Sequence, residues 1–222
     1  SADKTTFVTR KGSWKFRVLA YGLSNAPACF QRIMDRVLVG LTWEICLAFL
    51  DDVIIFSRTF EQHLERLSKV FDRLREANLK LKPSKCKLFQ TRVRFLGSVV
   101  SANGIEPDEE KVNAVVNWPI PQSVTETRAF TALASYYRRH IRNFAEIARP
   151  LHELTRKGQK FYWGERQQQA FERLKYCLVN APVLSAPRAE GTYILDTDGS
   201  SEALGAVLQQ EQDGEVKVIA YA

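Results

Sequence analysis

The most informative segment of this 222-residue chain is Cys46-Leu-Ala-Phe-Leu-Asp-Asp-Val-Ile-Ile-Phe56. Two short apolar runs, both rich in residues that favour strands, lie on either side of Asp51-Asp52. The pattern predicts a tight β-hairpin with the two aspartates at its tip.

Adjacent carboxylates at a hairpin tip repel one another unless positive charge lies between or beside them. A divalent cation supplies that charge, and magnesium ions clamped by carboxylates carry out the chemistry of polymerases and nucleases. The competing interpretation is a solvated Asp-Asp turn. The uniformly apolar flanks favour the metal site, since a polar turn does not need them.

Apolar periodicity and turn residues predict the elements around the hairpin. They are a hairpin over 5–18 that turns at Arg10-Lys-Gly12, a helix over 24–38 with Pro27 in its first turn, an amphipathic helix over 64–77, a strand over 92–101, helices over 112–116, 123–137, 147–155 and 167–178, and strands over 193–197, 203–210 and 216–222. Ser123-Val-Thr-Glu126 has the form of a capping box. Pro182 and Pro187 interrupt the helical pattern, which predicts a domain boundary near 182–190.

The net charge of +7 is concentrated in two basic blocks. Residues 58–94 and residues 128–176 each carry 11 basic against 4 acidic residues, so the remaining segments sum to about −7. This distribution favours a polyanion-binding surface, and solvated basic helices are the alternative. Four dispersed cysteines, with no CxxC pair, indicate neither a zinc site nor a disulfide framework. No apolar run is long enough to span a membrane, and an intracellular setting is expected.

A series of motifs along almost the whole chain resembles the pol polyprotein of gypsy-type LTR retrotransposons. Phe49-Leu-Asp-Asp52 is similar to the aromatic-x-Asp-Asp box of reverse transcriptases, and Gly22-Leu-Ser-Asn-Ala-Pro-Ala-Cys-Phe-Gln31 is similar to the motif that precedes it. The further matches, in order, are Leu79-Lys-Leu-Lys-Pro-Ser-Lys-Cys86, Phe95-Leu-Gly97, Trp118-Pro, Ser135-Tyr-Tyr-Arg-Arg139, Pro150-Leu and Pro182-Val-Leu184. An ordered series at fitting separations is far more specific than one motif.

The resemblance implies roles for the residues of the first half. Asp51 and Asp52 would be catalytic and would ligate Mg²⁺, or Mn²⁺ as the alternative ion, with Asp51 preferred as the direct ligand. Phe49 would pack near the primer terminus. The substrate-positioning loop and helix would include Gly22, Pro27 and Gln31, with Gln31 as a contact. Phe30 in the same motif has an equal alternative as a core residue.

The resemblance also assigns a primer grip and a thumb. Phe95, Leu96 and Gly97 would form the primer grip, where a glycine lets backbone approach nucleic acid closely; a strand glycine at a bulge is the alternative. In the thumb, Arg138, Arg139 and Arg142 on one helix, beside Tyr136 and Tyr137, could follow a phosphate backbone. One of the two tyrosines is expected in the core. His140 departs from the usual Phe.

The last segment is similar to the start of a ribonuclease H domain. Leu195-Asp-Thr-Asp-Gly-Ser200 followed by Gly205-Ala-Val-Leu208 carries the match. The resemblance implies that Asp198 is a catalytic metal ligand, and that Asp196, two residues earlier on the same strand face, is not. A surface loop is the alternative for this segment considered alone.

The implied fold class is α+β. It comprises a partial fingers and palm region over 1–106, built from a β-hairpin and helices, a helical thumb and connection over 107–185, and a truncated ribonuclease H-like α/β domain over 186–222. Both ends look cut, and the third polymerase carboxylate and the later ribonuclease H ligands are expected outside the sequence. The 222 residues alone are therefore expected to be inactive.

The implied function is RNA-directed DNA polymerase with attached ribonuclease H. The expected partners are an RNA or DNA template-primer, deoxynucleoside triphosphates and the rest of the polyprotein, in a cytoplasmic particle or the nucleus, with no membrane. The alternative is a degenerate or co-opted remnant that binds nucleic acid without catalysis.

Overall fold

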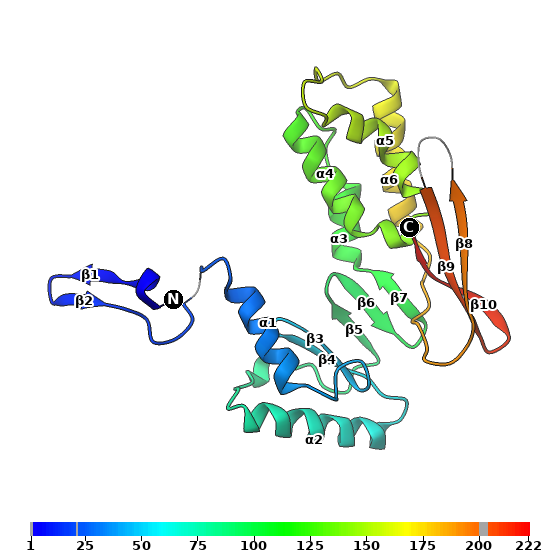
Figure 1. The fold of residues 1–222 in the computed structure, drawn as a ribbon. Helices are drawn as coiled ribbons and strands as arrows, with labels where there is room; N and C mark the ends of the chain where they lie inside the picture. The colour runs from blue at the N-terminus through cyan, green and yellow to red at the C-terminus, as the bar shows by residue number, and fades with distance from the viewer. Residues whose placement is uncertain (1, 21, 200–203) are drawn as a thin grey trace. The chain divides into compact units, whose positions relative to one another are not determined.

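The computed structural model describes residues 2–20, 22–199 and 204–222, and the chain divides into two compact units, Ser1–Phe89 and Gln90–Ala222 (Figure 1). The first contains β1 (Phe7–Thr9), β2 (Gly12–Trp14), α1 (Ala26–Val37), β3 (Cys46–Phe49), β4 (Asp52–Ile55) and α2 (Phe60–Glu76), with 3-10 helices at Ala2–Thr5 and Pro83–Lys85. The second contains β5 (Arg92–Phe95), β6 (Ser98–Ser101), β7 (Gly104–Pro107), α3 (Glu109–Val116), α4 (Val124–Tyr136), a 3-10 helix (Arg138–His140), α5 (Phe144–Leu154), α6 (Glu165–Val179), β8 (Tyr193–Gly199), β9 (Leu204–Gln212) and β10 (Glu215–Tyr221).

The hairpin β3–β4 lies at the centre of the first unit, as predicted. Its register pairs Phe49 with Asp52, which leaves Leu50 and Asp51 as the turn. Helices α1 and α2 pack against it through a shared apolar cluster formed by Met34, Leu38, Cys46, Val70 and Leu74. Helix α1, predicted from residue 24, begins at Ala26 with Pro27 in its first turn, whereas α2, predicted from residue 64, begins about one turn earlier at Phe60 with Thr59 as its N-cap.

The predicted strand over 92–101 is wrong, because the chain reverses in its middle. Strands β5 and β6 pair antiparallel and turn at Leu96 and Gly97, whose φ angles are 47° and 66°. Two successive residues at positive φ form the type of turn that matches the twist of a hairpin. Gly97 is therefore a turn residue and not a bulge. Strand β7, which had no strong sequence signal, pairs with β6.

The helices of the second unit enclose one apolar core. Helices α4, α5 and α6 pack side by side with α3 against α6 (Figure 1). The Phe130 and Phe171 ring centroids are 4.5 Å apart at its centre. The capping box at Ser123 forms with one change: Ser123 accepts from the N–H of Glu126, whereas the Glu126 carboxylate accepts from the N–H of Gln122.

The three thumb arginines do not lie on one helix. Helix α4 ends at Tyr136, Arg138 and Arg139 belong to the 3-10 helix, and Arg142 lies beyond it. The chain reverses into α5 through Asn143, whose φ is 58°, a conformation that Asn tolerates better than most residues. This reversal separates the arginines that a continuous helix would have placed together.

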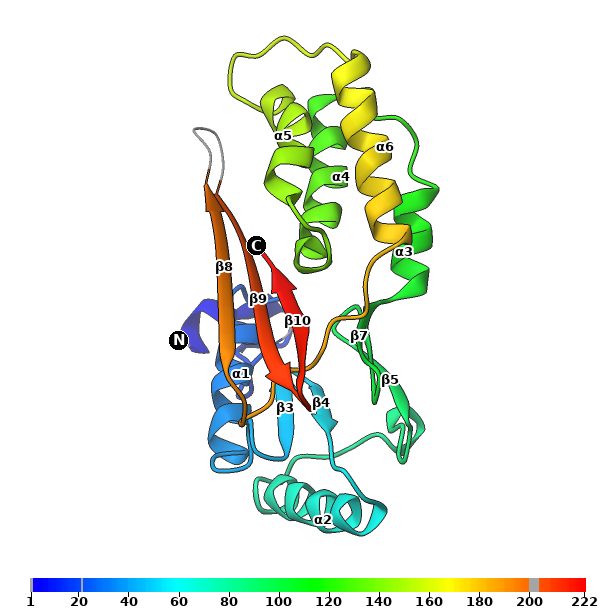
Figure 2. The same ribbon diagram turned by 90° about the vertical axis from the view of Figure 1, so that its right-hand side faces the viewer.

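The C-terminal strands form an antiparallel sheet in the order β10-β9-β8 (Figure 2). The strand predicted over 203–210 is observed as β9, which begins at Leu204. Ala203, and Ser200 of the preceding motif, lie outside the described residues. The segment that precedes the sheet is tied to it by buried Gln210, whose amide donates to the carbonyls of Arg188 and Glu190. No helix of the described residues is long and apolar enough to cross a bilayer.

His140 is a buried polar residue, with 2% of its surface exposed. Its Nδ1 donates to the carbonyl of Pro182 at 3.2 Å, and its Nε2 has no partner among the described residues. Burial lowers the pKa of His140 below its ordinary value, the bond to Pro182 opposes that change, and the charge of Arg139 adds to it. The folded chain therefore favours the neutral ring.

The pKa of His140 is lower in the folded chain than in the unfolded chain, where it is about 6.5, so the unfolded chain binds the proton more readily. The fold therefore loses stability as the pH decreases below about 6.5. We expect the free energy of unfolding to fall between pH 7.5 and pH 5, and His140→Phe to reduce this fall. Urea unfolding at both pH values measures it. His152→Gln, on an exposed residue of α5, is the control, and equal pH dependence in His140→Phe and the wild type would contradict the expectation.

Candidate active site

The two aspartates occupy different positions at the hairpin tip. Asp51 is the second turn residue, and Asp52 is the first residue of β4. Both side chains are exposed, whereas Cys46, Ala48, Val53 and Ile55 of the same strands face the core of the first unit. Alternation along the strands thus anchors the hairpin while it leaves the carboxylates in solvent.

Gln31 joins α1 to the hairpin tip. Its Oε1 accepts from the N–H of Leu50 at 2.6 Å, and its Nε2 donates to the Ala48 carbonyl at 3.3 Å and to Asp35 Oδ1 at 2.8 Å. Leu50 has a φ of 53°, which costs a residue with a Cβ about 1–2 kcal/mol. The Gln31 amide therefore stabilises a strained turn directly before the aspartates.

The other predicted residues of the first unit lie on the same two elements or precede them. Phe49 ends β3 opposite Asp52 and is 52% exposed. Pro27 is exposed in the first turn of α1, and Gly22 precedes that helix at a φ of 87°. Phe30 is half-buried and packs against the core, as its alternative interpretation required. The structure thus brings Gln31, Phe49, Asp51 and Asp52 together.

The aspartate pair fits part of a magnesium site. Mg²⁺ prefers oxygen ligands, and it is commonly held by one or two carboxylates, with water and substrate phosphates completing the coordination. Both carboxylates are exposed, and the turn that carries them is fixed by Gln31. In residues 2–20, 22–199 and 204–222, no group of three His, Cys, Asp or Glu side chains that could hold a metal ion occurs.

The remaining predicted residues belong to the second unit. Phe95, Leu96 and Gly97 form the end of β5 and its turn. Asp198 is exposed on β8, opposite Gly205 of β9. Asp196, on the same face, accepts a hydrogen bond from Gln209 Nε2, and this bond distinguishes it from Asp198.

Sequence reasoning missed the polar role of Tyr136 and Tyr137. Their hydroxyls donate to the carbonyls of Leu96 and Gly97 at 2.6 and 2.8 Å. Of the pair, Tyr137 is the expected core residue, 2% exposed, and Tyr136 is 57% exposed. The Ser135-Tyr-Tyr motif drew attention to these two residues, but it does not predict that their hydroxyls bind a turn 40 residues earlier in the chain.

Replacing Gln31 by leucine tests its support of the turn. Gln31→Leu removes the partners of the Leu50 and Ala48 backbone, so we expect exchange of the Leu50 amide hydrogen to accelerate about tenfold and the free energy of unfolding to fall by about 1–2 kcal/mol. Hydrogen exchange followed by NMR measures the first and urea unfolding the second. Arg32→Leu, at the next and exposed position of α1, is the control; unchanged exchange at Leu50 in Gln31→Leu would show that the amide does not hold the turn.

Two family models and several Pol polyproteins match this chain. Residues 3–100 match the family model of reverse transcriptase (RNA-dependent DNA polymerase), and residues 163–222 match that of the RNase H-like domain found in reverse transcriptase. The chain is 42% identical over 211 residues to the retrovirus-related Pol polyprotein from transposon 297 of Drosophila melanogaster, covering 95% of this chain and 20% of that protein. It is 37% identical over 222 residues to the Pol polyprotein from transposon gypsy of the same organism, covering 94% and 21%.

A solved structure of the foamy viral protease-reverse transcriptase, in complex with double-stranded DNA, has the same fold. It superposes with a TM-score of 0.84 at 25% identity, covering 98% of this chain and 38% of that one. The chain spans about a fifth of the length of the two transposon polyproteins. With reverse transcriptase and ribonuclease H-like segments in this order, the chain belongs to the retrovirus-related Pol polyproteins of retrotransposons.

Proposed function

We propose that the chain is the central part of an RNA-directed DNA polymerase with attached ribonuclease H. Residues 1–106 contribute part of the fingers and palm, 107–185 the thumb and connection, and 186–222 the N-terminal part of the ribonuclease H-like domain. The observation that carries the proposal is the exposed Asp51-Asp52 pair on a turn that Gln31 fixes, within the segment that matches reverse transcriptases.

In this proposal Asp51 and Asp52 hold Mg²⁺ or Mn²⁺, with Asp51 as the direct ligand. The ions, when bound, lower the pKa of the attacking hydroxyl and neutralise charge on the phosphoryl group. The protein's own contribution is geometric: Gln31 keeps the turn that carries the carboxylates in one conformation. Gln31 already binds the backbone of the turn. We propose that it contacts the incoming nucleotide in addition to holding the turn.

The exposed apolar surface near the aspartates suits the end of a primer. Phe49 is the exposed aromatic residue of β3 next to the turn, and we assign it to packing near the primer terminus. Gly22 and Pro27 shape the entry to α1, where the template and the nucleotide are positioned. In the ribonuclease H-like part we assign the metal ligand to Asp198, the position that the resemblance implies, whereas the Asp196 carboxylate accepts a hydrogen bond from Gln209 Nε2.

The proposed partners are a template-primer, deoxynucleoside triphosphates and the rest of the polyprotein. The protein similar in fold is described in complex with double-stranded DNA. Lys80, Lys82, Lys85 and Lys87 present four exposed cations within eight residues of the first basic block, which suits a phosphate backbone. We propose that this activity takes place inside the cell, in a cytoplasmic particle or the nucleus.

A chimera tests catalysis. This chain replaces the matching segment of the transposon 297 Pol polyprotein, which supplies the segments on either side. We expect Mg²⁺-dependent extension of a primer, and a decrease in kcat on the order of 100-fold in Asp51→Asn and in Asp52→Asn, because each loses one charge that the metal site requires. Steady-state primer extension measures kcat.

Asp72→Asn, an exposed residue of α2 paired with Arg75, is the matched control and should extend normally. A chimera that binds template-primer without extending it would favour the remnant alternative. The 222-residue chain by itself is expected not to extend primers, and Mg²⁺-dependent extension by the purified chain would contradict the expected incomplete metal site.

Binding to a template-primer should weaken steeply with salt, because each neutralised phosphate releases counterions. In the 222-residue chain, the double change Lys85→Gln and Lys87→Gln should reduce the slope of log affinity against log salt concentration by about one unit for each lysine that contacts a phosphate. Fluorescence anisotropy of a labelled duplex measures the slope. Lys69→Gln, which removes a lysine paired with Glu65 at 2.6 Å, is the control, and affinity that does not depend on salt would count against the surface.

A further inference from the structure

The turn between β5 and β6 is held from the side of α4 by two adjacent tyrosines. Tyr136 Oη donates to the Leu96 carbonyl at 2.6 Å, and Tyr137 Oη donates to the Gly97 carbonyl at 2.8 Å. The Gly97 carbonyl also accepts from the N–H of Asp108 at 3.1 Å. Both carbonyls of the two turn residues are therefore occupied.

These bonds support a strained backbone. Leu96 has a φ of 47°, a conformation that costs a residue of its type about 1–3 kcal/mol unless the surroundings hold it. Gly97 follows at 66°, and a Cβ at that position would lie 3.1 Å from Tyr136 Cε1 and 3.3 Å from each tyrosine hydroxyl. The turn thus fits the tyrosine pair closely, and only glycine suits its second position.

The two tyrosines also hold each other. Their ring centroids are 5.0 Å apart in an edge-to-face arrangement. Burial raises the pKa of Tyr137 to about 12, with smaller contributions from Tyr136 and Asp108, so its hydroxyl stays protonated and remains a donor throughout the physiological range. Tyr136 is 57% exposed, and the core therefore does not require its hydroxyl.

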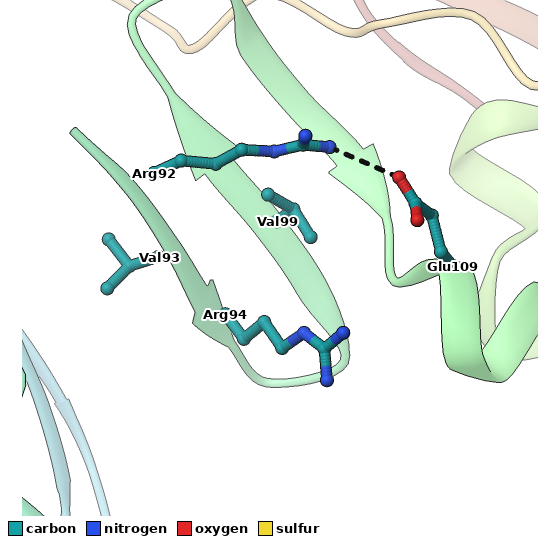
Figure 3. Close-up of a pocket in the computed structure, with 5 residues that line it drawn as sticks. All are labelled: Arg92, Val93, Arg94, Val99 and Glu109. Carbon is teal, nitrogen blue, oxygen red and sulfur yellow. Dashed lines mark ion pairs between the residues drawn. The ribbon is translucent and has the colours of Figure 1, made fainter. Parts of the chain in front are cut away.

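The strand that leads into the turn is fixed separately, to β7 and to the start of α3. Arg92 lies 2.6 Å from Glu106 and 3.6 Å from Glu109, and Arg94 pairs with Glu110 at 2.5 Å and with Asp108 at 3.6 Å. Figure 3 shows both arginines extending from β5, with the Arg92–Glu109 ion pair. The four carboxylates outnumber the two guanidinium groups, so this cluster carries a net negative charge and does not favour a phosphate in the pocket that Arg92, Arg94 and Glu109 line.

We propose that Tyr136 and Tyr137 are positioning residues for the primer, a role that rests on the proposed polymerase function. With both carbonyls bound by the tyrosines, the N–H groups of Leu96 and Gly97 are the polar backbone groups that the turn can offer to a ligand. Two successive N–H groups in a tight turn suit an anionic oxygen, such as a phosphate near the 3′ end of the primer. The Leu96 carbonyl and the Gly97 N–H belong to one planar peptide, so the bond from Tyr136 fixes the direction of that donor directly, and Tyr137 holds the next peptide of the same turn.

A cycle that combines protein and nucleic acid variants tests this role. The 222-residue chain and its Tyr136→Phe, Tyr137→Phe and double variants are titrated with a primer-template whose two terminal primer linkages are either phosphates or uncharged methylphosphonates. We expect the wild type to lose about tenfold in affinity on the methylphosphonate primer. On the unmodified primer, the double variant should bind about tenfold more weakly than the wild type. Its affinity should decrease little further when the terminal phosphates are replaced by methylphosphonates.

Two controls separate positioning from a general loss of structure. Methylphosphonates eight linkages upstream should have the same effect in every variant, and Tyr162→Phe, on an exposed tyrosine, should behave as the wild type. Tyr136→Phe changes an exposed hydroxyl and should keep the wild-type melting temperature within a few degrees, so its loss of coupling to the terminal phosphates cannot be attributed to unfolding.

The outcomes distinguish this inference from the function on which it rests. A wild-type chain that does not bind template-primer overturns the proposed function. A wild-type chain that binds, with terminal methylphosphonates costing the same in wild type and double variant, overturns the positioning role of the tyrosines alone.

Discussion

The first unit depends on holding two adjacent carboxylates at an exposed turn without burying them. Burial of Asp51 and Asp52 would cost more free energy than formation of the hairpin contributes, since an unpaired buried carboxylate is strongly unfavourable. The strands therefore place their apolar side chains in the core and leave the aspartates in solvent. Gln31 then fixes the backbone from α1, because the turn residue Leu50 has a strained conformation.

The second unit contains a comparable arrangement. Leu96, like Leu50, is a leucine at positive φ in a two-residue turn, and side chains from a helix bind the turn backbone in both places. In one turn an amide accepts from an N–H, and in the other two hydroxyls donate to carbonyls. Each arrangement leaves a defined set of groups facing outward: the carboxylates in the first case and, in our proposal, the N–H groups in the second.

Charge is distributed differently in the two units. Lysines on an irregular, exposed segment follow α2 in the first, whereas the arginines of β5 in the second are paired with carboxylates of β7 and of the start of α3. A count of basic residues along the sequence treats the two sets alike. The lysines have no ion-pair partner among the residues that the structure describes, so they are more available for phosphate groups than the arginines, whose guanidinium groups already bind carboxylates.

The sequence alone determined the hairpin, the amphipathic helices and the family, because these depend on residue spacing within a few positions and on ordered motifs. It also singled out Asp51, Asp52 and Asp198, whose metal-binding roles stay predictions. The tertiary structure decided the rest. It divided the strand predicted over 92–101 and separated the three thumb arginines, since left-handed residues such as Leu96 and Asn143 have no strong local signal. It also joined Gln31 to Leu50 and the tyrosine pair to a turn 40 residues earlier. Those contacts link residues far apart in the chain, and only the packing of helices against hairpins brings them within hydrogen-bonding distance.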